Sequence, residues 1–144
     1  MRWTIEKDIY DRMLGVCPVP PETGGIIGGE SMCISKIVVE ETRERYRYIP
    51  NVDFLNKTIS EWRSQGISFY GMFHSHPEGC ERLSKVDEEY IHTIMDAMPA
   101  QIDTLMFPLI LPGDKIIPFI ARRTENDVAI EQGELAVVES CRSY

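Results

Sequence analysis

The segment from Ile67 to Pro77 has the sequence ISFYGMFHSHP and predicts a buried strand that ends in a pair of histidines. Apolar and aromatic residues fill most of it, as in a strand of a protein core. Pro77 cannot donate to a strand ladder, so it ends the strand and turns the chain away. Because strand side chains alternate between faces, His74 and His76 project to one side and Ser75 to the other. Two imidazoles therefore lie together at the carboxyl end of a strand.

A second pattern follows on the next segment. Ser84-Lys85-Val86-Asp87 has the S-x-x-D spacing of a capping box, which puts Ser84 at a helix start and Asp87 in its first turn. If Asp87 folds back toward His74 and His76, two imidazoles and one carboxylate form a three-ligand zinc site with its fourth position open to water. Each pattern alone has a plainer explanation, a hydrogen-bonded or exposed histidine pair and an ordinary helix cap. Together they favour a catalytic metal site and indicate a hydrolase.

Hydrophobic spacing predicts three helices around these patterns. Apolar residues four apart predict a helix over 3–14, with Thr4 at the N-cap position. Spacings of three and four predict a second helix over 52–66, closing at a glycine, and a third over 84–98.

Strands alternate with these helices. Pro108 and Pro118 fall inside two of the predicted strands and cannot donate ladder hydrogen bonds, which predicts edges or bulges there. With the helices, the order is α-β-β-β-α-β-α-β-β, which indicates a mixed α/β fold in a single domain over 1–144. The predicted strands cover 24–29, 33–41, 67–74, 105–111 and 116–121, with an extended piece at 43–49 and a strand plus a loose tail over 127–141.

Charge and composition exclude several classes of protein. The 144 residues carry 15 basic and 23 acidic side chains, a net charge of -8, which argues against a nucleic-acid partner held by phosphate contacts. The N-terminus lacks the apolar segment of a signal peptide, and no apolar run approaches the ~20 residues of a membrane span. We therefore expect a cytoplasmic protein with no membrane partner. Its four cysteines are scattered without a Cys-x-x-Cys pair, so we expect free thiols.

The histidine and serine-aspartate patterns resemble a known motif. His74-Ser75-His76-Pro77, followed after a short loop by Ser84-x-x-Asp87, resembles the motif of the JAMM (MPN-plus) zinc metalloprotease family, which also has a glutamate upstream on a separate strand. Glu22 fits that position, because the following residues 23–28 are similar to the family's glycines and apolar strand. The resemblance covers 20–98, and the chain lacks room for the long insertions of eukaryotic deubiquitinating members. It is similar to the compact prokaryotic JAB-domain type.

This resemblance implies a fold and a set of roles. The fold would be a three-layer α/β domain, a mixed sheet flanked by helices, with the cytidine-deaminase-like architecture of JAMM/MPN proteins. His74, His76 and Asp87 would hold Zn²⁺, which lowers the pKa of a bound water to about 7. Glu22 would act as general base and pass the proton to the leaving amine, and Ser84 would donate to the oxyanion. Without the motif, Glu22 would be interpreted as a solvated turn residue.

Other features leave alternatives open. His92 falls within a predicted helix, and we expect it on the helix surface rather than in the site. Cys80 is either an ordinary loop thiol or a fourth ligand or redox switch. Gly24 and Gly25 either let a substrate backbone approach closely or let the chain bend. The alternating arginines of 43–47 form either a solvated face or a substrate-docking patch.

The resemblance implies a zinc-dependent peptidase or isopeptidase that hydrolyses an amide bond. Its substrate would be the flexible C-terminal Gly-Gly tail of a ubiquitin-like or sulfur-carrier protein. The alternative is a non-catalytic MPN-type scaffold or protein-interaction domain, against which the presence of all five functional positions argues. A zinc nucleobase deaminase would need His-x-Glu and Pro-Cys-x-x-Cys, which are absent. The sequence leaves open the type of amide bond, α-linked or lysine-linked, and the oligomeric state.

Overall fold

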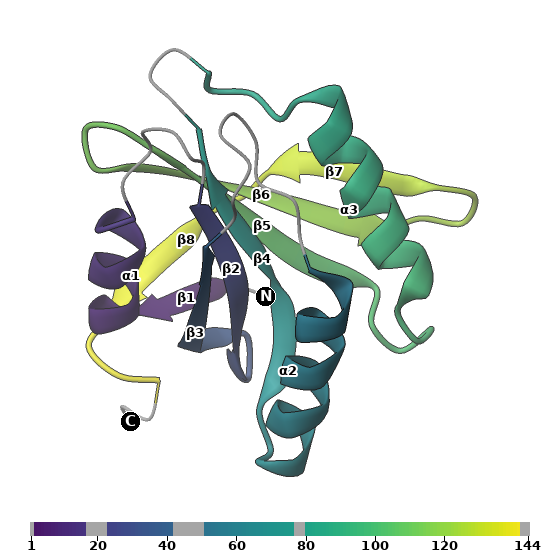
Figure 1. Cartoon of the computed structure of the whole chain (residues 1–144), viewed down its shortest axis with the longest axis horizontal. Coiled ribbons are helices and arrows are strands. Elements are labelled where there is room, and N and C mark those ends of the chain that lie inside the picture. Colours follow the sequence, from purple (N-terminus) through teal and green to yellow (C-terminus); the bar gives the residue numbers. More distant parts are fainter. Residues whose placement is uncertain (1, 17–22, 42–50, 77–79, 142–144) are drawn as a thin grey trace.

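The structure is a computed structural model of the chain and describes residues 2–16, 23–41, 51–76 and 80–141. None of its described helices is long and apolar enough to cross a lipid bilayer. The predicted extended piece at 43–49 lies outside the described residues. The elements run in the order β1 Trp3–Glu6, α1 Lys7–Leu14, β2 Thr23–Glu30, β3 Cys33–Glu41, α2 Val52–Ser64, β4 Ser68–Ser75, α3 Lys85–Ala97, β5 Thr104–Leu111, β6 Lys115–Arg123, β7 Val128–Gln132 and β8 Leu135–Val138 (Figure 1).

The described strands form one mixed sheet in the order β7-β6-β5-β4-β2-β3-β1-β8. Strand β4 lies near its centre, antiparallel to β2 and parallel to β5. Strands β7 and β8 stand at opposite ends of this order, yet only Gly133 and Glu134 separate them in the chain. Extended residues span at most about 3.6 Å each, so the two end strands approach within about 11 Å at this link. The sheet must therefore curl.

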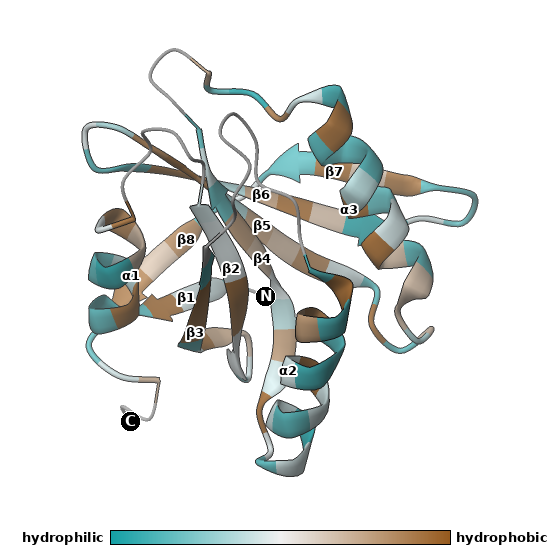
Figure 2. Ribbon diagram, in the orientation of Figure 1, coloured by the Kyte–Doolittle hydropathy of each residue, from teal (hydrophilic) through white to brown (hydrophobic). Residues whose placement is uncertain are grey.

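Side chains of the central strands alternate between two apolar layers. Ile26 and Met72 pack in one cluster with residues of α2 and α3, whereas their neighbours Ile27 and Phe73 pack in another with residues of α1. Helices α2 and α3 lie on one side of the sheet and α1 on the other (Figure 1). Each helix carries both apolar and polar residues (Figure 2). This composition is expected of a helix that buries one face and exposes the other. The predicted mixed α/β fold is confirmed, with helices on both faces of the sheet.

The predicted helix over 3–14 is wrong in its first four residues. These form β1, which lies between β3 and β8, and α1 follows with Glu6, not Thr4, at its N-cap. Ile5, Ile9 and Met13 are all buried in the α1 cluster, so the spacing of four identified true core residues. It did not reveal that Ile5 reaches the core from a strand, where burial alternates residue by residue.

The prediction of edges or bulges at Pro108 and Pro118 is also wrong, because β5 and β6 are interior strands and their shared register shows no shift at either proline. The two prolines are partners in the β5–β6 register. On the other side of β5, Pro108 lies between Met106 and Leu109, which pair with residues of β4, and has no such partner itself. The missing amide hydrogen of the proline therefore breaks no hydrogen bond with β4. The other predicted strands and helices match observed elements, except that the predicted loose tail contains a further strand, β8.

The prediction that all cysteines are free thiols is wrong for Cys33 and Cys141, which form a disulfide. They are 108 residues apart in the sequence, with a Cα–Cα distance of 5.6 Å. Sequence spacing could not reveal the pair, because Cys33 starts β3 and Cys141 follows β8, and these strands are brought near each other by β1, which pairs with both. Among the described cysteines, Cys80 is a free and exposed thiol.

A β-bulge interrupts the pairing of β2 with β4. Consecutive residues Ile27 and Gly28 pair with Gly71 and Phe69, so Tyr70 is an extra residue on β4. Gly71 has a φ of 143°, and a Cβ built on it would lie 1.7 Å from the carbonyl oxygen of Met106. Only glycine fits this position, because both the backbone angle and the close strand exclude a side chain.

We expect Gly71→Ala to lower the free energy of unfolding by at least about 3 kcal/mol, because β4 and β5 would have to separate. Gly113→Ala is the matched control: Gly113 also has a positive φ, 84°, but no atom beyond its chain neighbours lies within 4 Å of the point that a Cβ would occupy. It should cost about 1 kcal/mol, the penalty for the backbone angle alone. Urea unfolding measures both values, and equal costs would contradict the close contact with Met106.

We expect the paired variant Cys33→Ala/Cys141→Ala to lower the free energy of unfolding by about 2–4 kcal/mol, since the bridge closes a long loop of the unfolded chain. Reduction of the wild type should shift its melting temperature in the same direction. Cys80→Ala, which removes a thiol outside the bridge, should change neither quantity. A melting temperature that does not respond to reductant would count against the disulfide.

Candidate metal centre

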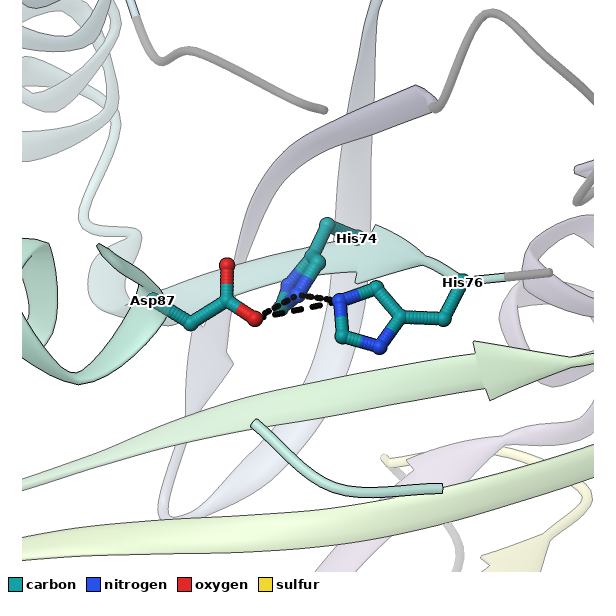
Figure 3. A group of neighbouring side chains, drawn as sticks. All are labelled: His74, His76 and Asp87. Carbon is teal, nitrogen blue, oxygen red and sulfur yellow. Dashed lines mark hydrogen bonds and ion pairs between the residues drawn. The ribbon is translucent and has the colours of Figure 1, made fainter. Parts of the chain in front are cut away.

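The carboxyl end of β4 delivers both histidines to the face covered by α3. His74 follows Met72 in the strand alternation and faces the same layer. Strand β4 ends at Ser75, but the amide of His76 donates to the carbonyl of Ile110 on β5 at 3.0 Å, which keeps the chain beside the sheet. Asp87 approaches from the first turn of α3, opposite the two rings (Figure 3).

Three potential ligand atoms converge at this point. The Nε2 atoms of His74 and His76 are 3.1 Å apart, and Asp87 Oδ2 lies 3.2 Å from the first and 3.0 Å from the second. All three side chains are buried. Ligand atoms about 2 Å from a tetrahedral zinc ion are separated from one another by about 3.3 Å. The group therefore fits a zinc ion with its three protein ligands on one side.

Hydrogen bonds alone account poorly for this triangle. A ring nitrogen has one N–H bond or one lone pair, and it can be aimed well at a single partner. Each Nε2 atom here has two close neighbours within 3.2 Å. A cation at the centre would satisfy both lone pairs and the carboxylate oxygen together.

The outer nitrogen of each ring also has a partner. His76 Nδ1 lies 3.0 Å from the carbonyl oxygen of Cys80, which can only accept, so Nδ1 carries the proton and the lone pair of the neutral ring is on Nε2. His74 Nδ1 lies 3.3 Å from the hydroxyl of Tyr90 on α3. Such outer hydrogen bonds fix the orientation of metal-binding imidazoles. Sequence reasoning missed Tyr90, although it lies three residues after Asp87 and so on the same helix face.

The predicted capping box is present at the start of α3. The amide of Asp87 donates to Ser84 Oγ at 3.0 Å, and the amide of Ser84 donates to Asp87 Oδ2 at 2.8 Å. Burial would raise the pKa of the Asp87 carboxyl, but the neighbouring His74 and His76 rings and the Ser84 amide together hold this pKa well below its usual range. Asp87 is therefore a carboxylate, as a metal ligand must be.

Of the two predicted catalytic residues, Ser84 is among the described residues and Glu22 is not. Ser84 lies beside the ligand group and is exposed to solvent, and its hydroxyl keeps a hydrogen to donate while it accepts from Asp87. Glu22 lies outside the described residues. The next residue, Thr23, is bound to β4 by its amide, which donates to Ser75 Oγ at 3.0 Å, and Gly24 pairs with His74. Strand β2 therefore begins at the end of the sheet where the histidines lie.

The remaining candidates lie apart from this group or outside the described residues. His92 lies on the surface of α3, as expected, and its ring nitrogen is 3.6 Å from the Asp127 carboxylate. The arginines of 43–47 are among the residues not described. Cys80 contacts the ligand group through its backbone carbonyl, which accepts from His76 Nδ1. Gly25 is predicted from the sequence to allow either substrate approach or a bend of the chain. The structure gives another reason for a glycine there, because a Cβ would lie 2.0 Å from the carbonyl oxygen of Val38.

Comparison with solved structures shows a shared fold. The solution structure of DSY2949 from Desulfitobacterium hafniense has 18% identity and a TM-score of 0.70, covering 96% of this chain and 94% of that one. A solution structure of a protein from Salinibacter ruber has 16% identity and a TM-score of 0.58, covering 100% and 95%. The crystal structure of AF2198, a JAB1/MPN domain protein from Archaeoglobus fulgidus, has 15% identity and a TM-score of 0.52, covering 95% and 98%.

No protein-family profile and no curated protein matches the chain. At identities below 20%, the structural likeness shows the fold over nearly the whole length of each chain. A shared fold does not carry a function by itself, so the function has to be argued from the His74, His76 and Asp87 group.

We expect the protein to bind one zinc ion per chain and Asp87→Asn to weaken zinc binding by at least about 100-fold, because it removes the only charged ligand of the group. Tyr90→Phe should weaken it by about 10-fold through the orientation of His74. Isothermal titration of the metal-free protein with zinc measures these affinities.

His92→Asn serves as the matched control, since it removes the one histidine that lies outside the group. It should bind zinc as the wild type does. The asparagine of Asp87→Asn keeps an oxygen that can accept from the Ser84 amide, so a melting curve separates loss of metal from loss of the helix cap. Equal zinc affinity in Asp87→Asn and His92→Asn would rule out the assigned ligands.

Proposed function

We propose that this protein is a zinc-dependent metallopeptidase of the JAMM/MPN type, acting on an amide bond at the C-terminal Gly-Gly tail of a ubiquitin-like or sulfur-carrier protein. The observation that carries the proposal is the convergence of His74 Nε2, His76 Nε2 and Asp87 Oδ2 within 3.2 Å of one another. Two imidazoles and one carboxylate leave a fourth zinc position for water, which is the arrangement of catalytic rather than structural sites. The fold shared with a JAB1/MPN domain protein supports the same proposal.

Zinc held by these residues would lower the pKa of a water ligand to about 7 and polarise a carbonyl group. Glu22 would take the proton released during attack on the amide and return it to the leaving amine. The exposed Ser84 hydroxyl would donate to the negative oxygen that develops on the carbonyl. Asp87, held by the Ser84 amide, fixes the distance between that donor and the ligand group.

Two things support the proposed substrate class, namely the burial of the proposed site and the resemblance of the motif. His74, His76 and Asp87 are buried at the end of the sheet, whereas Ser84 at its margin is exposed. A narrow tail without side chains could approach such a recessed group more easily than a folded segment. The same ligand set on a non-catalytic scaffold would bind zinc without hydrolysis, so activity, not metal content, separates these two functions.

We expect Glu22→Gln to abolish cleavage of fusions that carry a ubiquitin-like or sulfur-carrier protein while zinc remains bound, because glutamine cannot accept the proton. Cleavage is followed by electrophoresis and mass spectrometry, and zinc by metal analysis of the same samples. Zinc binding without cleavage of any fusion in the panel would favour the scaffold. Full activity of Glu22→Gln with zinc bound would exclude Glu22 as the base.

Ser84 requires separate variants because it also caps α3. Ser84→Ala should lower kcat by about 10²–10³, and the loss of the cap should also lower stability by about 1 kcal/mol. Ser84→Asp keeps a side chain that caps but has no hydroxyl, whereas Ser84→Thr keeps both functions. Recovery of stability in both variants but of kcat only in Ser84→Thr is the expected result. Recovery of kcat in Ser84→Asp would assign Ser84 to the cap alone.

A further inference from the structure

A cavity of about 530 Å³ opens at the end of the sheet opposite the metal centre. Its walls come from Trp3 at the start of β1, Tyr70 near the start of β4 and Thr104 at the start of β5. His74 lies four residues further along β4 than Tyr70, a separation of about 13 Å for an extended strand. The volume is within the range of small-molecule sites, and the cavity is not needed for the proposed hydrolysis.

The β-bulge on β4 places Tyr70 in the wall of this cavity, which Phe69 also lines. Phe69 packs in the layer under α2 and α3, whereas Tyr70 packs in the opposite layer with Trp3. The rings of Trp3 and Tyr70 are perpendicular, with an interplanar angle of 89° and centroids 5.1 Å apart. Bulges of this kind often re-aim a side chain next to a functional site. Two aromatic walls at right angles therefore form one corner of the cavity.

A strained turn presents Met32 to the same corner. Ser31 and Met32 form the two-residue turn between β2 and β3, and both have a positive φ, 52° and 60°. Side chains other than glycine, asparagine and aspartate rarely adopt two such angles in succession. The turn is held because the Met32 amide donates to the Tyr70 hydroxyl at 2.9 Å and the Thr4 amide donates to the Met32 carbonyl at 3.0 Å. These two bonds fix the backbone of Met32 beside Tyr70.

The charges at the rim of the cavity favour a cation. Arg122 and Glu131 form an ion pair at 3.3 Å and offset each other. Asp103 adds a further carboxylate, which accepts from the Thr104 hydroxyl at 3.1 Å. These three rim groups therefore carry one net negative charge, on a chain whose net charge is -8. An anionic ligand would be opposed by both the rim and the whole protein.

We propose that this cavity is a binding site for a small hydrophobic ammonium compound. The ammonium group would lie against the faces of Trp3 and Tyr70, which attract cations through the negative charge of their ring faces. Its apolar part would contact Met32, Ile102 and Ile120, all of which line the cavity. Asp103 at the rim supplies the charge that distinguishes a cation from a neutral compound of the same shape.

The test compares three probes that share one ring and differ in charge: benzyltrimethylammonium, benzyl alcohol and benzenesulfonate. Each is titrated into the ¹⁵N-labelled full chain, and amide chemical shifts report affinity and location. We expect saturable binding of benzyltrimethylammonium at least about tenfold tighter than that of benzenesulfonate. Shifts should concentrate around Trp3, Met32 and Tyr70 and should not change when zinc is added or chelated.

Two variants locate the site. Asp103→Asn removes a surface charge and should weaken benzyltrimethylammonium binding several-fold without changing that of benzyl alcohol. Asp96→Asn, an exposed acid on α3, is its control and should change neither. Ile102→Trp should fill part of the cavity and reduce binding of both probes. No saturable binding, equal affinity for the cation and the sulfonate, or shifts centred on His74 and His76 would each overturn the proposal.

Discussion

From Gly71 to Ser75, strand β4 is buried on both faces near the middle of the sheet, so every polar side chain in that stretch must find its partners inside the protein. Ser75 is satisfied on one face by the backbone of Thr23, which fixes the start of β2. His74 and the adjoining His76 are satisfied on the other by the first turns of α3 and the chain before it. The His74, His76 and Asp87 group is thus the means by which the end of a buried strand accommodates polar groups.

The bulge at Tyr70 determines which side chains of β4 face each side of the sheet. Before it, Phe69 faces α2 and α3; after it, Met72 and then His74 face that same layer, while Tyr70 turns to the opposite side. A single extra residue therefore lets one strand contribute to a candidate metal site at one end and to a cavity at the other. Gly71 makes this possible, because β5 passes too close for any side chain there.

The curl of the sheet has its own constraint in the short link between β7 and β8. Two residues join strands at opposite ends of the sheet order, and β8 pairs with β1, which in turn pairs with β3. The Cys33–Cys141 disulfide and the Glu6 carboxylate, which accepts from the Cys141 amide at 2.9 Å, fasten the segment after β8. Trp3 on β1 packs against Tyr70 on β4 in the same apolar layer.

Local patterns in the sequence determined α2, α3, most strands and the capping box at Ser84, because periodicity and short spacing act over a few residues. They named His74, His76 and Asp87 as candidate ligands, and the structure brings the three together. The prediction for Glu22 falls outside the described residues. Only the tertiary structure decided that Trp3–Glu6 is a strand, that the strand with Pro108 is interior, that Cys33 meets Cys141, and that Tyr90 supports His74. Each of these depends on a neighbour brought close by the curl of the sheet or by packing against it, and such neighbours leave no local pattern in the chain.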